Sequence, residues 1–394
     1  MTTKSSPSSA ADSSVHLYGP ENIHQLDWPA HEDGQYARLL LLPWMKNGAA
    51  HYIDNVETLL YVIQSGHTLL PVTVNEQQYT NSYVCSPYTH YIAYAAEELR
   101  ELKSPLLEAM LRPFLKLMGA AAVRSQINRA VCINNWLLST NLYPRLEPSQ
   151  ISSMTAEMLK RFPDHAILFR SINPRCYPDI YKALLDNGYR MIGSRQVYLF
   201  QGNGSNELSS KARWLIKRDE KLVEKQGYEV IRRDRLGPQD AARICELYRM
   251  LYLEKYSLHN PVFNERFFEL MLETGGLELI ALRKAGRIDA VLGYYVRNGI
   301  MTTPVFGYDT KLPQEAGLYR MLSAILIREA ETRKLWLNQS SGAAEFKRNR
   351  GAVGEIEYTA VYDRHLPVSR RSVWAMLEAI INRAGVPLMQ KRKL

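Results

Sequence analysis

Two stretches in which strand-like and helix-like segments alternate are separated by a short polar segment, and this arrangement constrains the fold most. The first stretch ends near residue 200 and the second begins near residue 208. Between them lies Gln201-Gly-Asn-Gly-Ser-Asn206, whose glycines and small polar side chains are typical of a linker. A length of 394 residues also exceeds the usual size of one domain. The sequence therefore predicts two domains with mixed sheets, in the α/β or α+β class.

The domain boundaries follow from changes in composition along the chain. The sequence predicts a flexible tail over 1–20, a first domain over 21–200, a linker over 201–207, a second domain over 208–366, and a helix with a basic tail over 367–394. Each half ends with a strand, a helix, a glycine turn and another strand, so an internal duplication is expected.

Several segments carry clear helix or strand signals. Helices are expected over Tyr177–Asn187 before Gly188, Leu208–Gln226 before Gly227, Arg235–Lys255, Asn264–Glu273 and 318–333. Strands are expected over Gln196–Phe200, Glu278–Leu282, Ile288–Val296, Gly299–Tyr308, Leu335–Asn338 and Ile356–Tyr362.

Composition excludes several classes of protein. Hydrophobic residues make up 46% of the chain and charged residues 23%, which excludes global disorder. The sequence has no apolar run of roughly 18 residues, so no membrane span is expected. No apolar stretch follows Lys4, which argues against a secretory signal. The four cysteines are widely spaced and form neither a disulfide framework nor a zinc motif: Cys85, Cys132, Cys176 and Cys245. These features predict a cytoplasmic protein without a metal.

The net charge of +9 favours polyanionic partners such as nucleic acid or phosphorylated ligands, although it is also compatible with simple solubility. The basic residues gather in clusters at Lys211 to Arg218, Arg232 to Arg235, Lys347 to Arg350, and Lys391 to Lys393. The last cluster belongs to the terminal tail and is expected to be solvated. The sequence lacks GxGxxG, GxxxxGK[ST], HExxH and GxSxG motifs, which leaves dinucleotide, P-loop, zinc-protease and serine-hydrolase chemistry without a signature.

The order of hairpin, strand, glycine turn and helix in the second half resembles the core of the GNAT acyltransferase superfamily. Its pattern Gln/Arg-x-x-Gly-x-Gly/Ala corresponds to Gln314-Glu-Ala-Gly317-Leu-Tyr319, which departs at the last position. In that superfamily, the turn and the following helix N-terminus hold the pyrophosphate of coenzyme A. The resemblance therefore implies donor contacts by Gln314, Gly317, Leu318, Tyr319 and Arg320. A simple turn before a helix explains the same residues.

The second half resembles more closely the Fem-like branch of this superfamily, whose members pair two GNAT-like domains. The branch includes peptidyltransferases that build peptidoglycan cross-bridges from aminoacyl-tRNA. Its Gly-x-x-x-Phe/Tyr-Lys pattern corresponds to Gly342 and Phe346-Lys347, and Gly307-Tyr308-Asp309 and Leu318–Arg320 are similar to it as well. The resemblance implies two tandem GNAT-like domains and places Lys347 at the start of a strand.

The chemistry expected of these residues centres on Lys347. A fixed ammonium compensates negative charge that develops when an amine attacks an ester or thioester. Asn338 is expected to hydrogen-bond the amine or the carbonyl. The remaining candidates for contacts with the ligand are Ser340, Ser341, Gly342, Phe346 and Arg350. The alternatives are a solvated lysine at a strand edge and a loop without a ligand.

Proton transfer has three candidate side chains. Glu345 and His259 are candidates for the general base, and Tyr308 is a candidate acid for the leaving group. Tyr256, His259 and Asn260 are expected to line an acceptor pocket. Taken alone, each of these residues is more typical of a structural role.

The sequence thus predicts an N-acyltransferase without a permanently bound cofactor. The favoured donor is acyl-coenzyme A, and the acceptor is an amine of a small molecule from cell-envelope or natural-product metabolism. One alternative is an aminoacyl-tRNA-dependent transferase of the Fem type, in which basic patches contact tRNA. Another is a binding protein that uses the same fold without catalysis.

Overall fold

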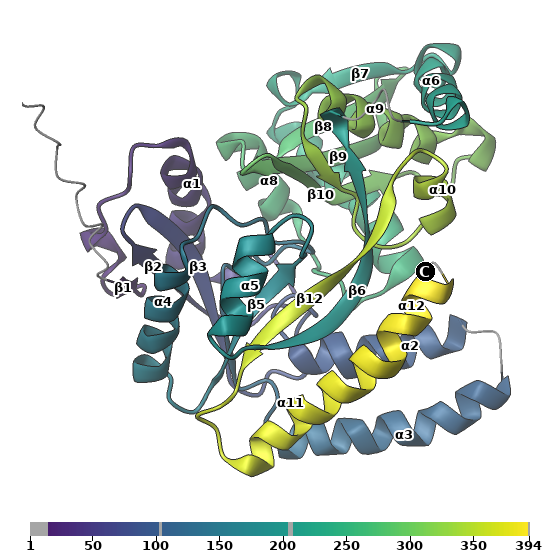
Figure 1. Ribbon diagram of the computed structural model, residues 1–394. Helices are drawn as coiled ribbons and strands as arrows, with labels where there is room; N and C mark the ends of the chain where they lie inside the picture. The colour runs from purple at the N-terminus through teal and green to yellow at the C-terminus, as the bar shows by residue number, and fades with distance from the viewer. Residues whose placement is uncertain (1–14, 102–104, 204–207, 393–394) are drawn as a thin grey trace, which may run out of the picture.

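Twelve strands of the described residues form one continuous mixed sheet in the computed structural model (Figure 1). The structure describes residues 15–101, 105–203 and 208–392. The first six strands are β1 (Val15–Tyr18), β2 (Leu59–Ser65), β3 (Thr68–Asn75), β4 (Ala130–Ile133), β5 (Ala166–Ile172) and β6 (Arg190–Gln201). The other six are β7 (Glu229–Arg232), β8 (Glu278–Lys284), β9 (Arg287–Arg297), β10 (Ile300–Tyr308), β11 (Trp336–Asn338) and β12 (Val353–Tyr362). The predicted mixed α/β class is confirmed.

Helices cover both faces of the sheet, because successive strand residues point into different cores. In β5, Ile167 and Phe169 belong to one hydrophobic core, whereas Leu168 belongs to another on the opposite face. The α-helices are α1 (Glu32–Asn47), α2 (Tyr94–Glu101), α3 (Pro105–Arg124), α4 (Pro148–Arg161), α5 (Pro178–Asp186), α6 (Ser210–Lys225), α7 (Ala241–Tyr248), α8 (Glu265–Thr274), α9 (Leu318–Thr332), α10 (Ala344–Arg348), α11 (Val368–Ile380) and α12 (Val386–Arg392). Within the described ranges, none of these helices combines the length and the apolar character needed to cross a bilayer.

The strand order reveals an internal duplication. Across the sheet the order is β1-β2-β3-β4-β5-β12-β6-β11-β10-β9-β8-β7. The order is symmetric about its centre, so that β1 to β5 correspond to β7 to β11. Strand directions match as well, since β4 and β5 are parallel, β10 and β11 are parallel, and the other neighbours are antiparallel. The two halves of the chain therefore share one topology.

The two halves also exchange their last strands. Strand β12, from the second half, lies between β5 and β6, and β6, from the first half, pairs with β11 (Figure 1). The β12–β6 pairing extends from Val353–Leu199 to Val361–Arg190. Each half is therefore completed by a strand of the other half.

Cleavage of the chain within 204–207 is expected to leave the two fragments associated, because the exchanged strands hold them together. A protease site inserted there, digestion in native buffer and gel filtration check this expectation. Two separately eluting fragments, each with a cooperative thermal transition, would contradict the exchange. The intact inserted variant, digested after denaturation, serves as the control for complete cleavage.

Several expected elements appear with small shifts, and others differ. The expected helices over Tyr177–Asn187 and Asn264–Glu273 correspond to α5 and α8, and the Asn264 side chain caps α8 by accepting the Phe267 N–H. The helix expected over Arg235–Lys255 begins only at Ala241, because Pro238 starts a separate short turn, and it continues as a π-helix, η7 (Arg249–Tyr256). The tail predicted over 1–20 is too long, since β1 pairs with β2; residues 1–14 lie outside the described residues.

Candidate active site

Strands β10 and β11 run side by side for only three residue pairs and then part. The last pair is Thr302 and Asn338, after which β10 continues to Tyr308 while β11 ends. Parallel strands that part in this way leave backbone groups without a neighbouring strand at the parting point. On one side lies the end of β10, and on the other lies the loop 339–343, which carries the predicted glycine and serines.

The loop 339–343 has a strained backbone. Ser340 and Ala343 have φ values of 58° and 47°, in the left-handed region that β-carbons disfavour, and Gly342 has a φ of 77°. The Asn338 side-chain oxygen accepts the Ser340 N–H at 2.9 Å. Strain of this kind persists only where surrounding contacts fix the backbone. Asn338 is therefore one of the residues that hold the loop in this conformation.

Lys347 supplies the main contact that fixes this loop. Its ammonium donates to the carbonyl oxygens of Gln339, Ser340 and Ser341 at 2.6, 3.2 and 2.8 Å. The side chain is buried, and this burial, together with the nearby charge of Arg195, lowers its pKa to about 7. The resemblance placed Lys347 at the start of a strand, but it lies in the short helix α10. Its three N–H groups face backbone carbonyls, so the contacts favour a positioning role for Lys347.

Aromatic side chains gather beside this loop, and they include predicted site residues from different elements. The Tyr319 ring lies 4.9 Å from the Phe346 ring and 6.4 Å from the Tyr308 ring, between centroids. Burial raises the pKa of Tyr319, and the neighbouring Tyr256 and Tyr308 hydroxyls raise it further. We call Tyr256, Tyr308, Tyr319 and Phe346 the aromatic cluster. Four of the predicted site residues thus lie together.

Tyr308 has a cationic partner on the neighbouring π-helix. The Lys255 ammonium donates to the Tyr308 hydroxyl at 3.1 Å, and this hydrogen bond raises the pKa of Lys255. The backbones of β10 and α7 are close here because Gly307 has no side chain. A β-carbon at Gly307 would lie 2.6 Å from the Leu247 carbonyl carbon. The hydroxyl of Tyr308 therefore has a proton source in direct contact.

A buried carboxylate of α6 lies beside the start of α9. Asp219 has no exposed surface, and it accepts hydrogen bonds from Arg218, Arg320 and Arg350. The Arg320 Nε–Oδ1 and Nη2–Oδ1 distances are 2.8 and 2.6 Å. Arg350 also donates to the Phe346 carbonyl and stacks on the Phe346 ring. The guanidinium groups of Arg320 and Arg350 are thus paired with an internal carboxylate, and their contacts with a ligand stay a prediction.

Helix α6 also covers the predicted glycine turn before α9. Gly317 has a φ of 72° and ends the 3-10 turn η8 (Gln314–Ala316). A β-carbon at Gly317 would lie 3.1 Å from a methyl carbon of Leu222 on α6. Leu318 is buried in the hydrophobic core of the second half, and the side chain of Gln314 is exposed.

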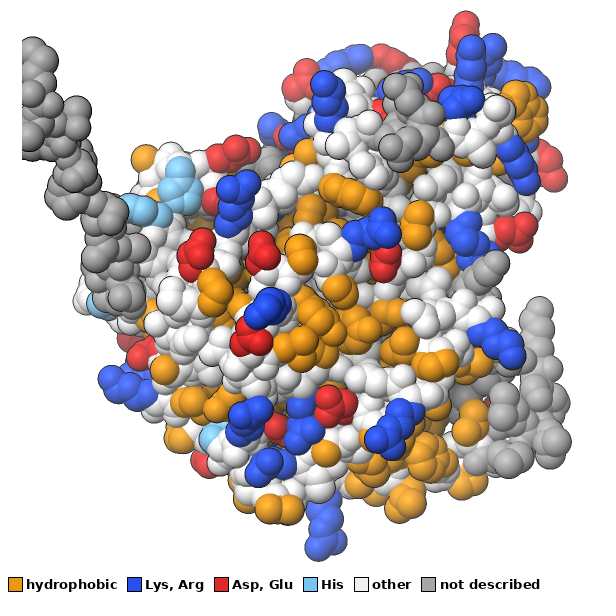
Figure 2. All heavy atoms as spheres, in the orientation of Figure 1, with side chains coloured by type: hydrophobic (Ala, Val, Ile, Leu, Met, Phe, Trp, Pro, Cys, Tyr) orange, Lys and Arg blue, Asp and Glu red, His pale blue; other side chains and the backbone are white. Residues whose placement is uncertain are grey.

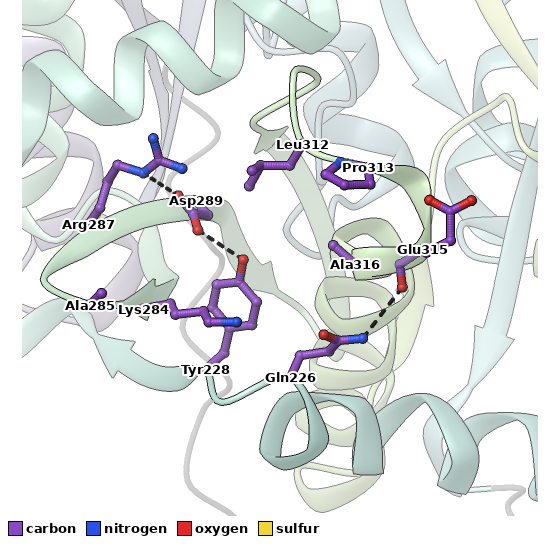
Figure 3. A pocket seen from close by; sticks show the side chains of 10 residues that line it. All are labelled: Gln226, Tyr228, Lys284, Ala285, Arg287, Asp289, Leu312, Pro313, Glu315 and Ala316. Atoms are coloured by element: carbon purple, nitrogen blue, oxygen red, sulfur yellow. Dashed lines mark hydrogen bonds and ion pairs between the residues drawn. The ribbon is translucent and has the colours of Figure 1, made fainter.

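A cavity of about 660 Å³ lies on the outer side of the loop that precedes α9 (Figure 3). The Tyr228 hydroxyl donates to Asp289 at 2.9 Å and Arg287 donates to the same carboxylate at 2.8 Å. Gln226 closes one side by donating to the Glu315 carbonyl at 3.5 Å. The polar groups of this cavity are mostly paired with one another, and none of the predicted site residues lines it.

Three predicted residues lie away from the aromatic cluster. The His259 carbonyl accepts the Tyr83 N–H at 3.1 Å, and the Asn260 side chain donates to the backbone of η7. The His259 contact, together with the Asn55 side chain that donates to the Asn260 carbonyl at 2.8 Å, joins the segment 257–263 to the first half of the chain. Glu345 is exposed on the outer side of α10. The structure therefore does not bring His259 or Glu345 next to the Tyr308 hydroxyl.

A buried ion pair near Lys347 was missed by sequence reasoning. Arg195 of β6 donates to Glu357 of β12 at 2.9 Å, and its other donors contact the Ser139 carbonyl and the Thr140 hydroxyl. Glu357 is 2% exposed, and among the described residues its second oxygen, Oε2, has no hydrogen-bond partner. A glutamate inside the predicted strand Ile356–Tyr362 was the available signal. No group of three or more His, Cys, Asp and Glu side chains within the described ranges is placed to hold a metal.

Comparisons with known proteins show a family match in the second half of the chain. The acetyltransferase (GNAT) domain family matches residues 210–348. No curated protein matches the sequence. Among solved structures, the chain is similar to the C-terminal domain of a putative lysylphosphatidylglycerol synthetase from Agrobacterium fabrum (13% identity, 59% of this chain and 77% of that chain, TM-score 0.43). It is also similar to FemX (9% identity, 58% of this chain and 78% of that chain, TM-score 0.43). A third similar structure is a tandem GNAT protein from the clavulanic acid biosynthesis pathway (10% identity, 88% of this chain and 98% of that chain, TM-score 0.36).

Proposed function

We propose that the chain is an amide-forming acyltransferase whose donor is an aminoacyl ester of tRNA, and the match of residues 210–348 to the acetyltransferase (GNAT) domain family supports the acyltransferase class. The observation that carries this choice of donor is the buried carboxylate of Asp219. This carboxylate accepts hydrogen bonds from Arg320 and Arg350 beside the N-terminus of α9. In coenzyme A-dependent members of the superfamily, the corresponding helix N-terminus holds the pyrophosphate.

Three features together disfavour coenzyme A in its usual position. The Asp219 carboxylate already accepts the Nε–H and Nη2–H groups of Arg320, so these donors are not available to a phosphate. Leu222 covers the Gly317 turn, where a phosphate needs close access to the backbone. The Tyr319 ring occupies the position where the superfamily pattern has glycine or alanine, and it packs between Phe346 and Tyr308. These residues do not fit a bound pyrophosphate, whereas an aminoacyl ester needs only access to the aromatic cluster.

The reaction is the attack of an amine on the ester carbonyl. A nitrogen–carbon bond forms, the carbon–oxygen bond to the ribose breaks, and one proton moves from the amine to the ribose oxygen. In this proposal, Tyr308 gives its proton to the departing oxygen and regains one from Lys255. The proton released by the amine then returns to Lys255 through solvent. The strained loop held by Lys347 forms the other wall of the site.

Donor consumption tests this function. The full chain is incubated with total tRNA charged with radiolabelled amino acids, or with radiolabelled acyl-coenzyme A, in the presence of a pool of small primary amines. The proposal expects amine-dependent loss of label from tRNA and formation of labelled amide. Amine-dependent consumption of acyl-coenzyme A alone would contradict it. No consumption of either donor would favour the non-catalytic alternative.

Replacing Tyr308 by phenylalanine is expected to lower turnover about a hundredfold, within the usual range for loss of a general acid. Folding should be little affected, because the lost hydrogen bond joins partly exposed side chains. Tyr228→Phe is the matched control, since it removes a hydroxyl from the cavity of Figure 3 rather than from the aromatic cluster. Equal turnover of the two variants would remove Tyr308 from the mechanism.

A further inference from the structure

Helix α6 exposes a tryptophan in the middle of a row of basic side chains. Trp214 is 60% exposed, which is unusual for the largest apolar side chain. Lys211, Trp214, Arg218, Lys221 and Lys225 are spaced by three, four, three and four residues, so they lie on one face of the helix. We call these five residues the α6 stripe. Lys217 and Arg213 are exposed along one side of it.

The opposite face of α6 is packed against the rest of the second half. Ala212, Leu215 and Ile216 are buried, and Asp219 ties the helix to Arg320 at the start of α9 and to Arg350. The Ser209 side chain caps the helix by accepting the Ala212 N–H at 3.1 Å. These contacts hold the helix backbone in place, so the stripe keeps its position on the surface of the second half.

The charge of this surface favours an anionic partner. Five lysine and arginine side chains of α6 are exposed, whereas Glu224 is the only exposed acid among residues 210–225. Glu220 is only partly exposed, and it is paired with Arg328 at 2.7 Å. The guanidinium of Arg218 lies 4.9 Å from the centre of the Trp214 ring. Figure 2 shows blue side chains gathered over α6 at the upper right of the molecule.

We propose that the α6 stripe binds single-stranded RNA, with a base stacked on Trp214 and the adjoining phosphates on its lysines. Every base has a flat face that stacks on an aromatic ring, and lysines at helical spacing can follow a phosphate backbone. This inference rests on the proposed function, for which the RNA is the 3′ end of the aminoacyl-tRNA. The stripe is connected to the aromatic cluster through Asp219, because Arg218 shares this carboxylate with Arg350, which stacks on Phe346.

An anionic membrane is the other class of partner that basic helices bind. Membrane-surface helices present several large apolar side chains on one face. The α6 stripe has only one, Trp214, among four basic residues. A single aromatic ring is enough for stacking on one base. One ring alone buries little apolar surface in a bilayer. RNA is therefore the partner that the stripe fits.

Fluorescence anisotropy with the full chain tests the inference. The probe is a labelled single-stranded RNA that ends in CCA. Trp214→Ala is expected to weaken binding about tenfold, and Trp214→Phe to restore most of it, because stacking needs only an aromatic face. Lys211→Glu with Lys221→Glu is expected to weaken binding at least about tenfold and to reduce its dependence on salt. Lys160→Glu with Arg161→Glu on α4 has the same change in charge and should bind normally.

The outcomes separate the surface from the proposed function. Equal RNA binding by Trp214→Ala, the α4 control and the unaltered chain would contradict RNA binding by the α6 stripe. Binding of anionic phospholipid vesicles with no binding of the RNA would overturn it as well. If the RNA binds through the stripe but charged tRNA is not consumed, RNA binding by the α6 stripe is supported and the aminoacyl-transfer function is contradicted. If charged tRNA is consumed equally by Trp214→Ala, the function stands and the surface fails.

Discussion

Replacing Asp219 by alanine is expected to lower the free energy of unfolding by about 3–5 kcal/mol, as for the loss of one partner from a buried ion pair. The carboxylate has no exposed surface, and the Arg350 side chain that it neutralises is 5% exposed. Without Asp219, a buried guanidinium keeps its charge with no carboxylate beside it. Thermal or chemical unfolding of the purified variant measures the loss. Glu220→Ala, which removes a partly exposed ion pair on the same helix, should cost below about 1 kcal/mol.

Added anions distinguish this explanation from simple loss of packing. Inorganic pyrophosphate is expected to raise the melting temperature of the Asp219→Ala variant, because it can bind the three arginines that the carboxylate leaves. The unaltered chain should not respond, since its own carboxylate already occupies them. Equal responses of the two proteins, or equal stability of Asp219→Ala and Glu220→Ala, would contradict the role given to Asp219.

Replacing Lys347 by methionine is expected to lower both stability and activity. The variant keeps most of the side-chain volume but removes the donors to three carbonyl oxygens. The Ser340 carbonyl still accepts the Tyr198 N–H, and Ser341 is exposed to water, so the acceptor left without a partner is chiefly the Gln339 carbonyl, and a loss of about 1–3 kcal/mol is expected. The released loop should also abolish turnover. Chemical unfolding and the donor assay measure the two effects, and a stable variant without activity would favour a direct catalytic role instead.

The pH dependence of stability provides a second test of Lys347. Its pKa is about 7 in the folded chain, whereas a lysine in an unfolded chain has a pKa near 10.4. Between these values the unfolded chain binds the extra proton, so the stability contributed by Lys347 rises with pH, by up to about 1.4 kcal/mol per pH unit. The stability difference between the unaltered chain and Lys347→Met should therefore grow from about pH 7 to about pH 10. A difference that is constant over this range would contradict the lowered pKa.

Local signals in the sequence predicted the elements that depend on neighbouring residues. Gly188 and Gly227 mark the ends of α5 and α6, and both have the left-handed backbone that their positions require. The helix over 318–333 and the strand before it were predicted from apolar spacing and correspond to α9 and β10. The aromatic cluster was also within reach, because Tyr308, Tyr319 and Phe346 stand in the motifs that carry the resemblance.

Features that depend on distant pairing were not predictable in the same way. The strand pattern of Ile356–Tyr362 identifies β12, but it contains no information that the strand inserts between β5 and β6. Asp219 looks like one more charge on a polar helix, and its burial follows only from the approach of α9 and of Arg350. The contacts of Lys347 were not predictable for the same reason, since its acceptors are carbonyls of a loop whose strained shape no local pattern indicates.

The donor site can be tested most directly by a structure of the full chain with a stable analogue of the donor, an adenosine whose 3′ position carries an amide-linked amino acid. In such a structure the 3′ nitrogen, which stands in for the departing ribose oxygen, is expected to lie within hydrogen-bond distance of the Tyr308 hydroxyl. Asp219 is expected to stay paired with Arg320 and Arg350, and Leu222 to cover Gly317. A structure in which coenzyme A binds with its pyrophosphate on Gly317 and Arg320, and displaces Asp219, would contradict the proposed donor.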